Sequence, residues 1–139
     1  MTIPEEETGA IAPPNTKGHI LIVDDDRNVI SFLRLALEND GYTISCAECG
    51  KQALEMLTKR SFAVMVTDLN MPGMDGFELA LLAHGIRQDL TIFMGTGHQY
   101  PGIHEQAASV GIRKVFSKPL DFEQLQHALR EASMLVVRT

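Results

Sequence analysis

Long apolar runs and an excess of basic residues are both missing from this sequence of 139 residues. No apolar stretch is long enough to span a bilayer. The first residues include Glu5, Glu6 and Glu7, where a secretory signal would carry positive charge. The formal net charge of −6 argues against nucleic acid as a direct partner, because phosphate binding needs a basic surface. We therefore expect a cytoplasmic protein with no membrane partner and no direct nucleic-acid partner.

Zinc-binding and nucleotide-binding motifs are missing as well. The two cysteines, Cys46 and Cys49, have no second pair at a suitable spacing to complete the four ligands of a zinc site. We interpret them as ordinary residues where a strand ends and a helix begins. The stretch 95–100 has Tyr100 where a nucleotide-binding loop would have its third glycine, and no G-x-x-x-x-G-K-[ST] motif is present. The sequence therefore carries no signal for a bound nucleotide.

The sequence does contain a regular alternation of two kinds of segment. Its 45% apolar and 22% charged residues suit one globular domain. Short apolar runs typical of buried strands occur at 20–23, 42–46, 62–68, 90–94 and 114–117. Apolar residues follow these runs at helical spacing, among them Val29, Phe32, Leu33, Leu37, Ala53, Leu57, Phe77, Ala80, Leu81, Leu82, Ile86, Ile103, Ala107, Leu125 and Leu129. Five such repeats predict an α/β fold, a doubly wound five-stranded parallel sheet with helices on both faces.

The two ends of the chain differ from this alternation. The first residues contain Pro4, Pro13 and Pro14 and few apolar side chains, which predicts a flexible arm over 1–17. We expect one domain over 18–134 and a tail or the start of a linker over 135–139. The sequence leaves open whether this is a free-standing protein or a piece of a longer regulator or hybrid kinase.

Polar side chains stand where the predicted strands end, and in a parallel sheet these ends meet at one edge. They are Asp24, Asp25, Asp26, Asp68, Thr96 and Lys118. Carboxylates that converge on one point favour Mg²⁺, which prefers oxygen ligands, while Asp26 suits the first turn of a helix. A carboxylate, a metal ion, a hydroxyl and an ammonium are together the parts of a phosphoryl-transfer site.

The motifs "ILIVDDD", "VMVTDLNMPGMDG", "MGTG" and "FSKPL" occur in this order over residues 19–133, and in this combination the chain resembles the receiver domain of two-component response regulators. The resemblance implies a flavodoxin-like sheet with strand order 2-1-3-4-5. It implies that Asp68 accepts a phosphoryl group from the phosphohistidine of a sensor histidine kinase or phosphotransfer protein. It also implies that Asp24, Asp25, Asp68 and the backbone carbonyl of Asn70 hold Mg²⁺.

The resemblance assigns further roles around Asp68. Thr96 would hydrogen-bond the phosphoryl group, and Lys118 would pair with Asp68 before phosphorylation and with the phosphoryl group afterwards. The Lys118–Pro119 bond would be cis. The first helix and the adjoining loop would contact the kinase, and the face of helix four, strand five and helix five would contact an output partner or a second copy. His98, near the expected pocket, is interpreted as a solvated loop residue.

One position departs from the family pattern. Family members commonly carry an aromatic residue three positions before the lysine, where this chain has Val115. Alternation along a strand places Phe116 on the opposite face, in the core. The switching motion of that aromatic residue is therefore in doubt, and the output face would signal by movement of helix four or signal weakly.

The leading hypothesis is a phosphorylation-dependent signalling module that catalyses only its own phosphorylation and dephosphorylation and is not otherwise an enzyme. A second hypothesis is a small phosphohydrolase that uses Asp24 and Asp26 as an Asp-x-Asp pair. A third is a receiver-like scaffold without phosphoryl transfer, which the missing aromatic residue keeps open.

Overall fold

The structure is a computed structural model that describes residues 17–138, with side chains through Ala132. Residues 1–16 of the predicted arm lie outside the described residues, and the last helix extends to Arg138, through most of the predicted tail. The domain boundaries stay a prediction. Within the described residues, no helix is both long enough and apolar enough to cross a membrane.

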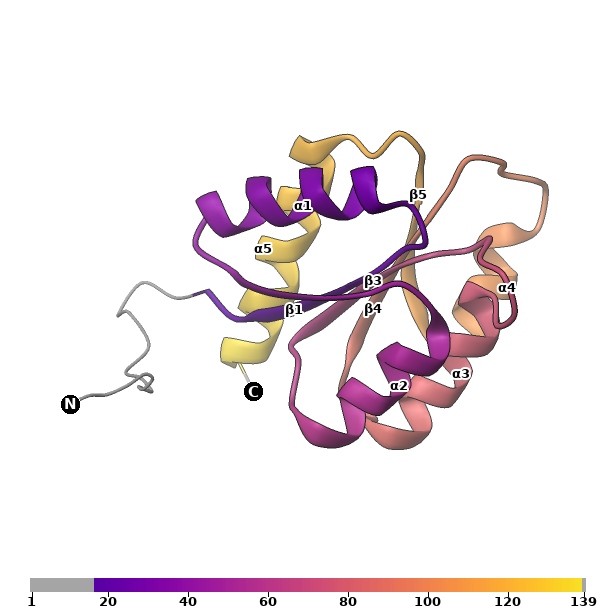
Figure 1. Ribbon diagram of the computed structural model, residues 1–139, viewed down its shortest axis with the longest axis horizontal. Coiled ribbons are helices and arrows are strands. Elements are labelled where there is room, and N and C mark those ends of the chain that lie inside the picture. Colours follow the sequence, from indigo (N-terminus) through magenta and orange to yellow (C-terminus); the bar gives the residue numbers. More distant parts are fainter. Residues whose placement is uncertain (1–16, 139) are drawn as a thin grey trace.

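A five-stranded sheet forms the centre of the molecule (Figure 1). Its strands are β1 (His19–Val23), β2 (Thr43–Ala47), β3 (Val64–Asp68), β4 (Thr91–Thr96) and β5 (Ile112–Ser117). Every neighbouring pair is parallel and the spatial order is β2-β1-β3-β4-β5. The predicted fold and strand order are therefore confirmed. Because all strands run the same way, their carboxyl ends lie at one edge of the sheet.

Five helices cover the two faces of the sheet: α1 (Arg27–Asn39), α2 (Gly50–Lys59), α3 (Gly76–Ile86), α4 (Ile103–Ser109) and α5 (Phe122–Arg138). Helices α1 and α5 pack on one face, and α2, α3 and α4 pack on the other (Figure 1). Each face has its own apolar layer. The layer under α1 and α5 contains Leu33, Phe116 and Leu129, whereas the layer under α2, α3 and α4 contains Leu57, Ala80 and Val115.

Aspartates begin three of the helices. Asp26 and Asp75 accept hydrogen bonds from the backbone N–H groups of Asn28 and Glu78 at the start of α1 and α3. Asp121 accepts bonds from the N–H groups of two residues in the first turn of α5. These caps fix where each helix begins after its strand.

Two details of the sequence interpretation can be compared with this fold. Cys46 lies in β2 and Cys49 directly precedes α2, as interpreted, and both are free thiols. Phe32 and Leu81, which fitted the helical spacing, are each 59% exposed. Helical spacing indicates the helix, but it does not decide which apolar residues at the margin of its apolar face are buried.

Candidate functional site

Three charged side chains from three different strand ends meet at the carboxyl edge of the sheet. Lys118 Nζ donates to Asp24 Oδ2 at 2.8 Å and lies 3.2 Å from Asp68 Oδ1. Both carboxylates are buried. The sequence predicted that these residues converge, and the structure places them together. The shorter contact of the lysine is to Asp24, a pairing that the sequence had not suggested.

The three consecutive aspartates after β1 have three different environments. Asp24 is buried, and its Oδ1 accepts a hydrogen bond from the N–H of Asp26 at 2.9 Å while its Oδ2 accepts from Lys118. Asp25 is exposed. Asp26 accepts from the N–H of Asn28 and begins α1, as predicted. Their mutual repulsion is reduced because one pairs with a cation and another faces the positive end of a helix.

Asp24, Asp25 and Asp68 can each direct one carboxylate oxygen into a common space. These three oxygens lie within 4.8 Å of one another. Carboxylates are hard oxygen donors and Mg²⁺ usually takes one or two of them beside its waters, so the donor set fits this ion. Asn70 follows Asp68 by two residues and is exposed; the role of its backbone carbonyl stays a prediction.

The charges of the cluster shift two pKa values. Burial, followed by the negative charge of Asp24, raises the pKa of Asp68, and Lys118 offsets this rise only in part. Burial lowers the pKa of Lys118, but the hydrogen bond and charge of Asp24, together with those of Asp68, outweigh it and raise that pKa overall. Lys118 therefore keeps its proton at neutral pH, whereas burial and the charge of Asp24, which raise the pKa of Asp68, disfavour its ionised form in the metal-free protein.

A glycine that no sequence motif singled out for this role packs directly against the backbone of Asp68. Gly76, the first residue of α3, donates its N–H to the carbonyl of Leu69 at 2.8 Å. A Cβ at this position would lie 2.6 Å from the carbonyl oxygen of Asp68. Only glycine lets α3 approach so closely. The motif "VMVTDLNMPGMDG" ends with this glycine, but no sequence pattern indicated what the glycine touches.

Thr96 ends β4 next to Lys118, whose backbone N–H donates to the Thr96 carbonyl at 2.9 Å. The threonine side chain is fully buried. Its hydroxyl accepts from the N–H of His98 at 3.2 Å and donates to the carbonyl of the same residue at 3.3 Å. In this state the hydroxyl bonds its own loop, and its contact with a phosphoryl group on Asp68 stays a prediction. His98 itself is exposed.

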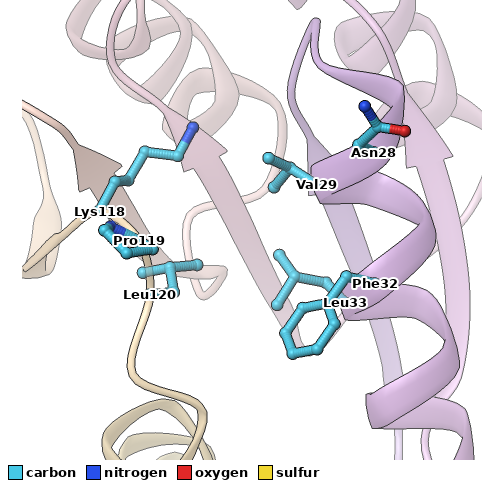
Figure 2. Close-up of a pocket in the computed structure, with 7 residues that line it drawn as sticks. All are labelled: Asn28, Val29, Phe32, Leu33, Lys118, Pro119 and Leu120. Carbon is cyan, nitrogen blue, oxygen red and sulfur yellow. The ribbon is translucent and has the colours of Figure 1, made fainter.

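A groove of about 240 Å³ opens beside the cluster, between α1 and the β5–α5 loop (Figure 2). It is lined by Asn28, Val29, Phe32, Leu33, Lys118, Pro119 and Leu120. The groove is mostly apolar, and the side chain of Lys118 extends along one wall (Figure 2). The same lysine thus lines the groove and contacts the acidic cluster. The Lys118–Pro119 bond is cis, as predicted.

Comparisons with known proteins agree with this arrangement. The sequence model of the response regulator receiver domain matches residues 20–130. The response regulator receiver protein CpdR of Brucella abortus (strain 2308) is 35% identical over 112 residues, which cover 81% of this chain and 93% of that protein. The transcriptional regulatory protein GlrR of Escherichia coli (strain K12) is 29% identical over 82% of this chain, which spans only 26% of that longer protein. The response regulator TrrA of Thermotoga maritima, solved with Mg²⁺–BeF, superposes with a TM-score of 0.73 at 27% identity, covering 82% of this chain and 97% of that one.

Proposed function

Because the chain belongs to the family of response regulator receiver domains of two-component systems, we propose that it accepts a phosphoryl group on Asp68 from the phosphohistidine of a sensor kinase or phosphotransfer protein. One observation carries the proposal. One carboxylate oxygen of Asp68 lies within 4.8 Å of one oxygen each of Asp24 and Asp25, and Lys118 bridges Asp68 and Asp24. The proposed nucleophile, the proposed metal ligands and a cation lie close together, which supports the proposal.

The transfer would be a single in-line displacement. An oxygen of Asp68 forms a bond to phosphorus while the phosphorus–nitrogen bond of the phosphohistidine breaks. The electron pair of the broken bond stays on the imidazole nitrogen, which takes up a proton, and the product on this chain is an acyl phosphate. Lys118, which already donates toward both carboxylates, would pair with the incoming group, whose charge is about −1.5 to −2.

Magnesium fits the same cluster. Asp24, Asp25 and Asp68 would hold it, with the backbone carbonyl of Asn70 as a further predicted ligand. When bound, the ion would supply positive charge to the phosphoryl oxygens and to the carboxylates around them. Lys118 can do only part of this, because the pKa of Asp68 remains raised in its presence.

The phosphoryl group would act as a switch. It presents new acceptor oxygens, and Thr96 would turn its hydroxyl from His98 toward one of them. That turn would alter the end of β4 and the adjoining α4, on the predicted output or dimer face of α4, β5 and α5. A shift from 1:99 to 99:1 needs about 5.5 kcal/mol in favour of the active form. Several charge-assisted hydrogen bonds are of the right size to supply it.

The groove of Figure 2 is the proposed contact for the phosphohistidine donor. Its apolar wall contains Phe32, which is 59% exposed, and its end is Lys118, which also contacts Asp68. A donor protein that covers Phe32 would therefore bring its histidine close to Asp68. Continuity between groove and acidic cluster is the reason to assign this surface to the donor.

The two other hypotheses make different use of the same residues. A phosphohydrolase with Asp24 and Asp26 as its working pair is poorly supported, because the carboxylate of Asp26 is engaged at the start of α1. That hypothesis also leaves Asp68 without a role. A scaffold without phosphoryl transfer would keep the fold and lack only the chemistry. We propose that the chain acts on no substrate other than its own phosphoryl group.

One experiment separates these possibilities. The protein is incubated with acetyl phosphate and Mg²⁺ and its intact mass is measured. We expect the wild type to gain one phosphoryl group, Asp68→Asn to gain none, and Asp75→Asn, a change in the helix cap of α3, to gain one as the wild type does. Sustained turnover of an aryl phosphate would support the phosphohydrolase. No added mass, under conditions that label a control receiver, would support the scaffold and overturn the proposal.

A further inference from the structure

A side-chain hydrogen bond connects the β4–α4 loop to the end of β5. Gln99 Nε2 donates to Ser117 Oγ at 2.8 Å. Gln99 lies three residues after Thr96, in the loop whose backbone at His98 holds the Thr96 hydroxyl. The bond therefore joins the segment that holds Thr96 to a second strand.

Ser117 is well placed for this link. It is the strand partner of Thr96 in the parallel pairing of β4 and β5, and it directly precedes Lys118, whose N–H donates to the Thr96 carbonyl. Gln99 thus reaches from its loop back to the strand end that carries the lysine of the site. The bond to Ser117 restrains this loop when Thr96 changes its hydrogen-bond partner.

The two apolar residues of β5 that precede Ser117 cannot make such a link. Val115 is buried in the layer under α2, α3 and α4. Valine has no group that can hydrogen-bond Thr96 or the loop. Phe116 is buried on the opposite face, against Phe93. Neither side chain can hydrogen-bond the β4–α4 loop, whereas Ser117 accepts a hydrogen bond from Gln99 of that loop.

We propose that Gln99 is a positioning residue for Thr96. Through Ser117 it holds the β4–α4 loop in the state in which the Thr96 hydroxyl bonds His98, and it thereby opposes the turn of that hydroxyl toward Asp68. The proposal rests on the proposed function for its consequence, which is the sensitivity of the switch. The position of the Thr96 hydroxyl in the unmodified protein does not depend on that function.

The expected effect is modest because both residues are exposed. The loss of one hydrogen bond of this kind shifts a two-state equilibrium by about two- to tenfold. Gln99→Ala and Ser117→Ala should each tighten the apparent affinity for beryllofluoride with Mg²⁺ by about that factor. The double variant should resemble the single ones, because either change removes the same bond.

The test uses four variants and two measurements. The variants are Gln99→Ala, Ser117→Ala, the double change, and Gln52→Ala as a matched control that removes an exposed glutamine contact to Glu48 on the β2–α2 loop. The first measurement is the χ1 rotamer distribution of Thr96 from three-bond NMR couplings in the unmodified, metal-free protein. The second is the titration with beryllofluoride and Mg²⁺ by calorimetry.

The proposal expects a changed Thr96 rotamer distribution in both single variants and in the double one, but not in Gln52→Ala. An unchanged distribution in Gln99→Ala overturns it, whatever happens to thermal stability. If the wild type binds no beryllofluoride and takes no label from acetyl phosphate, the proposed function fails, and the rotamer measurement still decides the role of Gln99. If the rotamers change but the affinity does not, the link to the switch is refuted.

Discussion

Replacing Lys118 with methionine tests the electrostatic account of the site most directly. Methionine keeps most of the length of the side chain and removes the charge. The two carboxylates that Lys118 bridges, at 2.8 Å to Asp24 and 3.2 Å to Asp68, would then face each other without a cation. We expect the metal-free variant to be less stable than the wild type at neutral pH.

The size of the loss follows from the geometry. Opposite charges at 2.8 Å attract by about 6 kcal/mol at an effective dielectric constant of about 20, which is an upper limit. Breaking a buried ion pair by removing one partner costs about 3–5 kcal/mol. The lysine side chain is 21% exposed, and water reduces the cost. We expect a loss of about 2–3 kcal/mol in the free energy of unfolding.

The pH dependence has a definite sign. The pKa of Lys118 is raised in the folded protein, where the attraction of Asp24 and Asp68 outweighs burial. Its contribution is therefore complete below the unfolded value of 10.5 and is lost as the pH rises through the folded pKa. In Lys118→Met the loss should appear at lower pH, as Asp68, whose pKa is already raised in the presence of the lysine, ionises without a neighbouring cation.

Urea unfolding with and without Mg²⁺ is the assay. The control is Lys114→Met, which removes an exposed lysine whose ammonium lies 5.2 Å from the centre of the Phe116 ring and should cost less than about 1 kcal/mol. Mg²⁺ should stabilise Lys118→Met more than the wild type, because the ion then replaces the missing cation. A loss no larger than that of the control, with equal response to Mg²⁺, would refute this account of the cluster.

Three further predictions follow from other parts of the structure. Gly76→Ala should lower the free energy of unfolding by about 1–3 kcal/mol because its Cβ would meet the Asp68 backbone. The control Gly85→Ala, which has open space around it in the same helix, should be neutral or stabilising, and thermal unfolding compares the two variants. Burial lowers the pKa of His19 from 6.5, so the free energy of unfolding should fall as the pH drops through 6.5 toward that lowered value. A His19→Gln variant whose free energy of unfolding, measured with urea, falls equally with pH would contradict this. Phe32→Ala should slow phosphoryl transfer from an autophosphorylated histidine kinase at least about threefold, as expected for one lost apolar contact, while labelling by acetyl phosphate stays unchanged. Equal slowing with both donors would argue against the groove as the donor contact.

The sequence predicted the fold and the convergence of the site because both follow from simple periodicities. Strand and helix alternate five times, and parallel strands end at one edge. The strand order that the family resemblance implied then makes Asp24, Asp68, Thr96 and Lys118 neighbours, and the structure has that order. The opposite orientation of Val115 and Phe116 follows from the alternation along a strand, and the structure confirms it.

The remaining features depend on side-chain packing, which no local pattern encodes. Helix α3 is apolar on most of its surface, so its sequence could not tell that Leu81 would be exposed while Ala80 is buried. The shorter contact of Lys118 with Asp24 depends on the side-chain rotamers of two residues that are 94 positions apart in the sequence. The bond from Gln99 to Ser117 joins two loop-end residues whose types carry no periodic signal.

The separation of the apolar interior into two layers, one on each side of the sheet, has a consequence for how such a chain can be altered. Side chains in one layer contact helices that the other layer does not reach, so substitutions in the two layers should combine additively. Protein engineers could therefore redesign the interior beneath α2, α3 and α4 without retuning the half that supports α1 and its groove. Substitutions of Asp68 and Lys118, which lie at the edge of the sheet between the two layers, are not expected to be additive in this way.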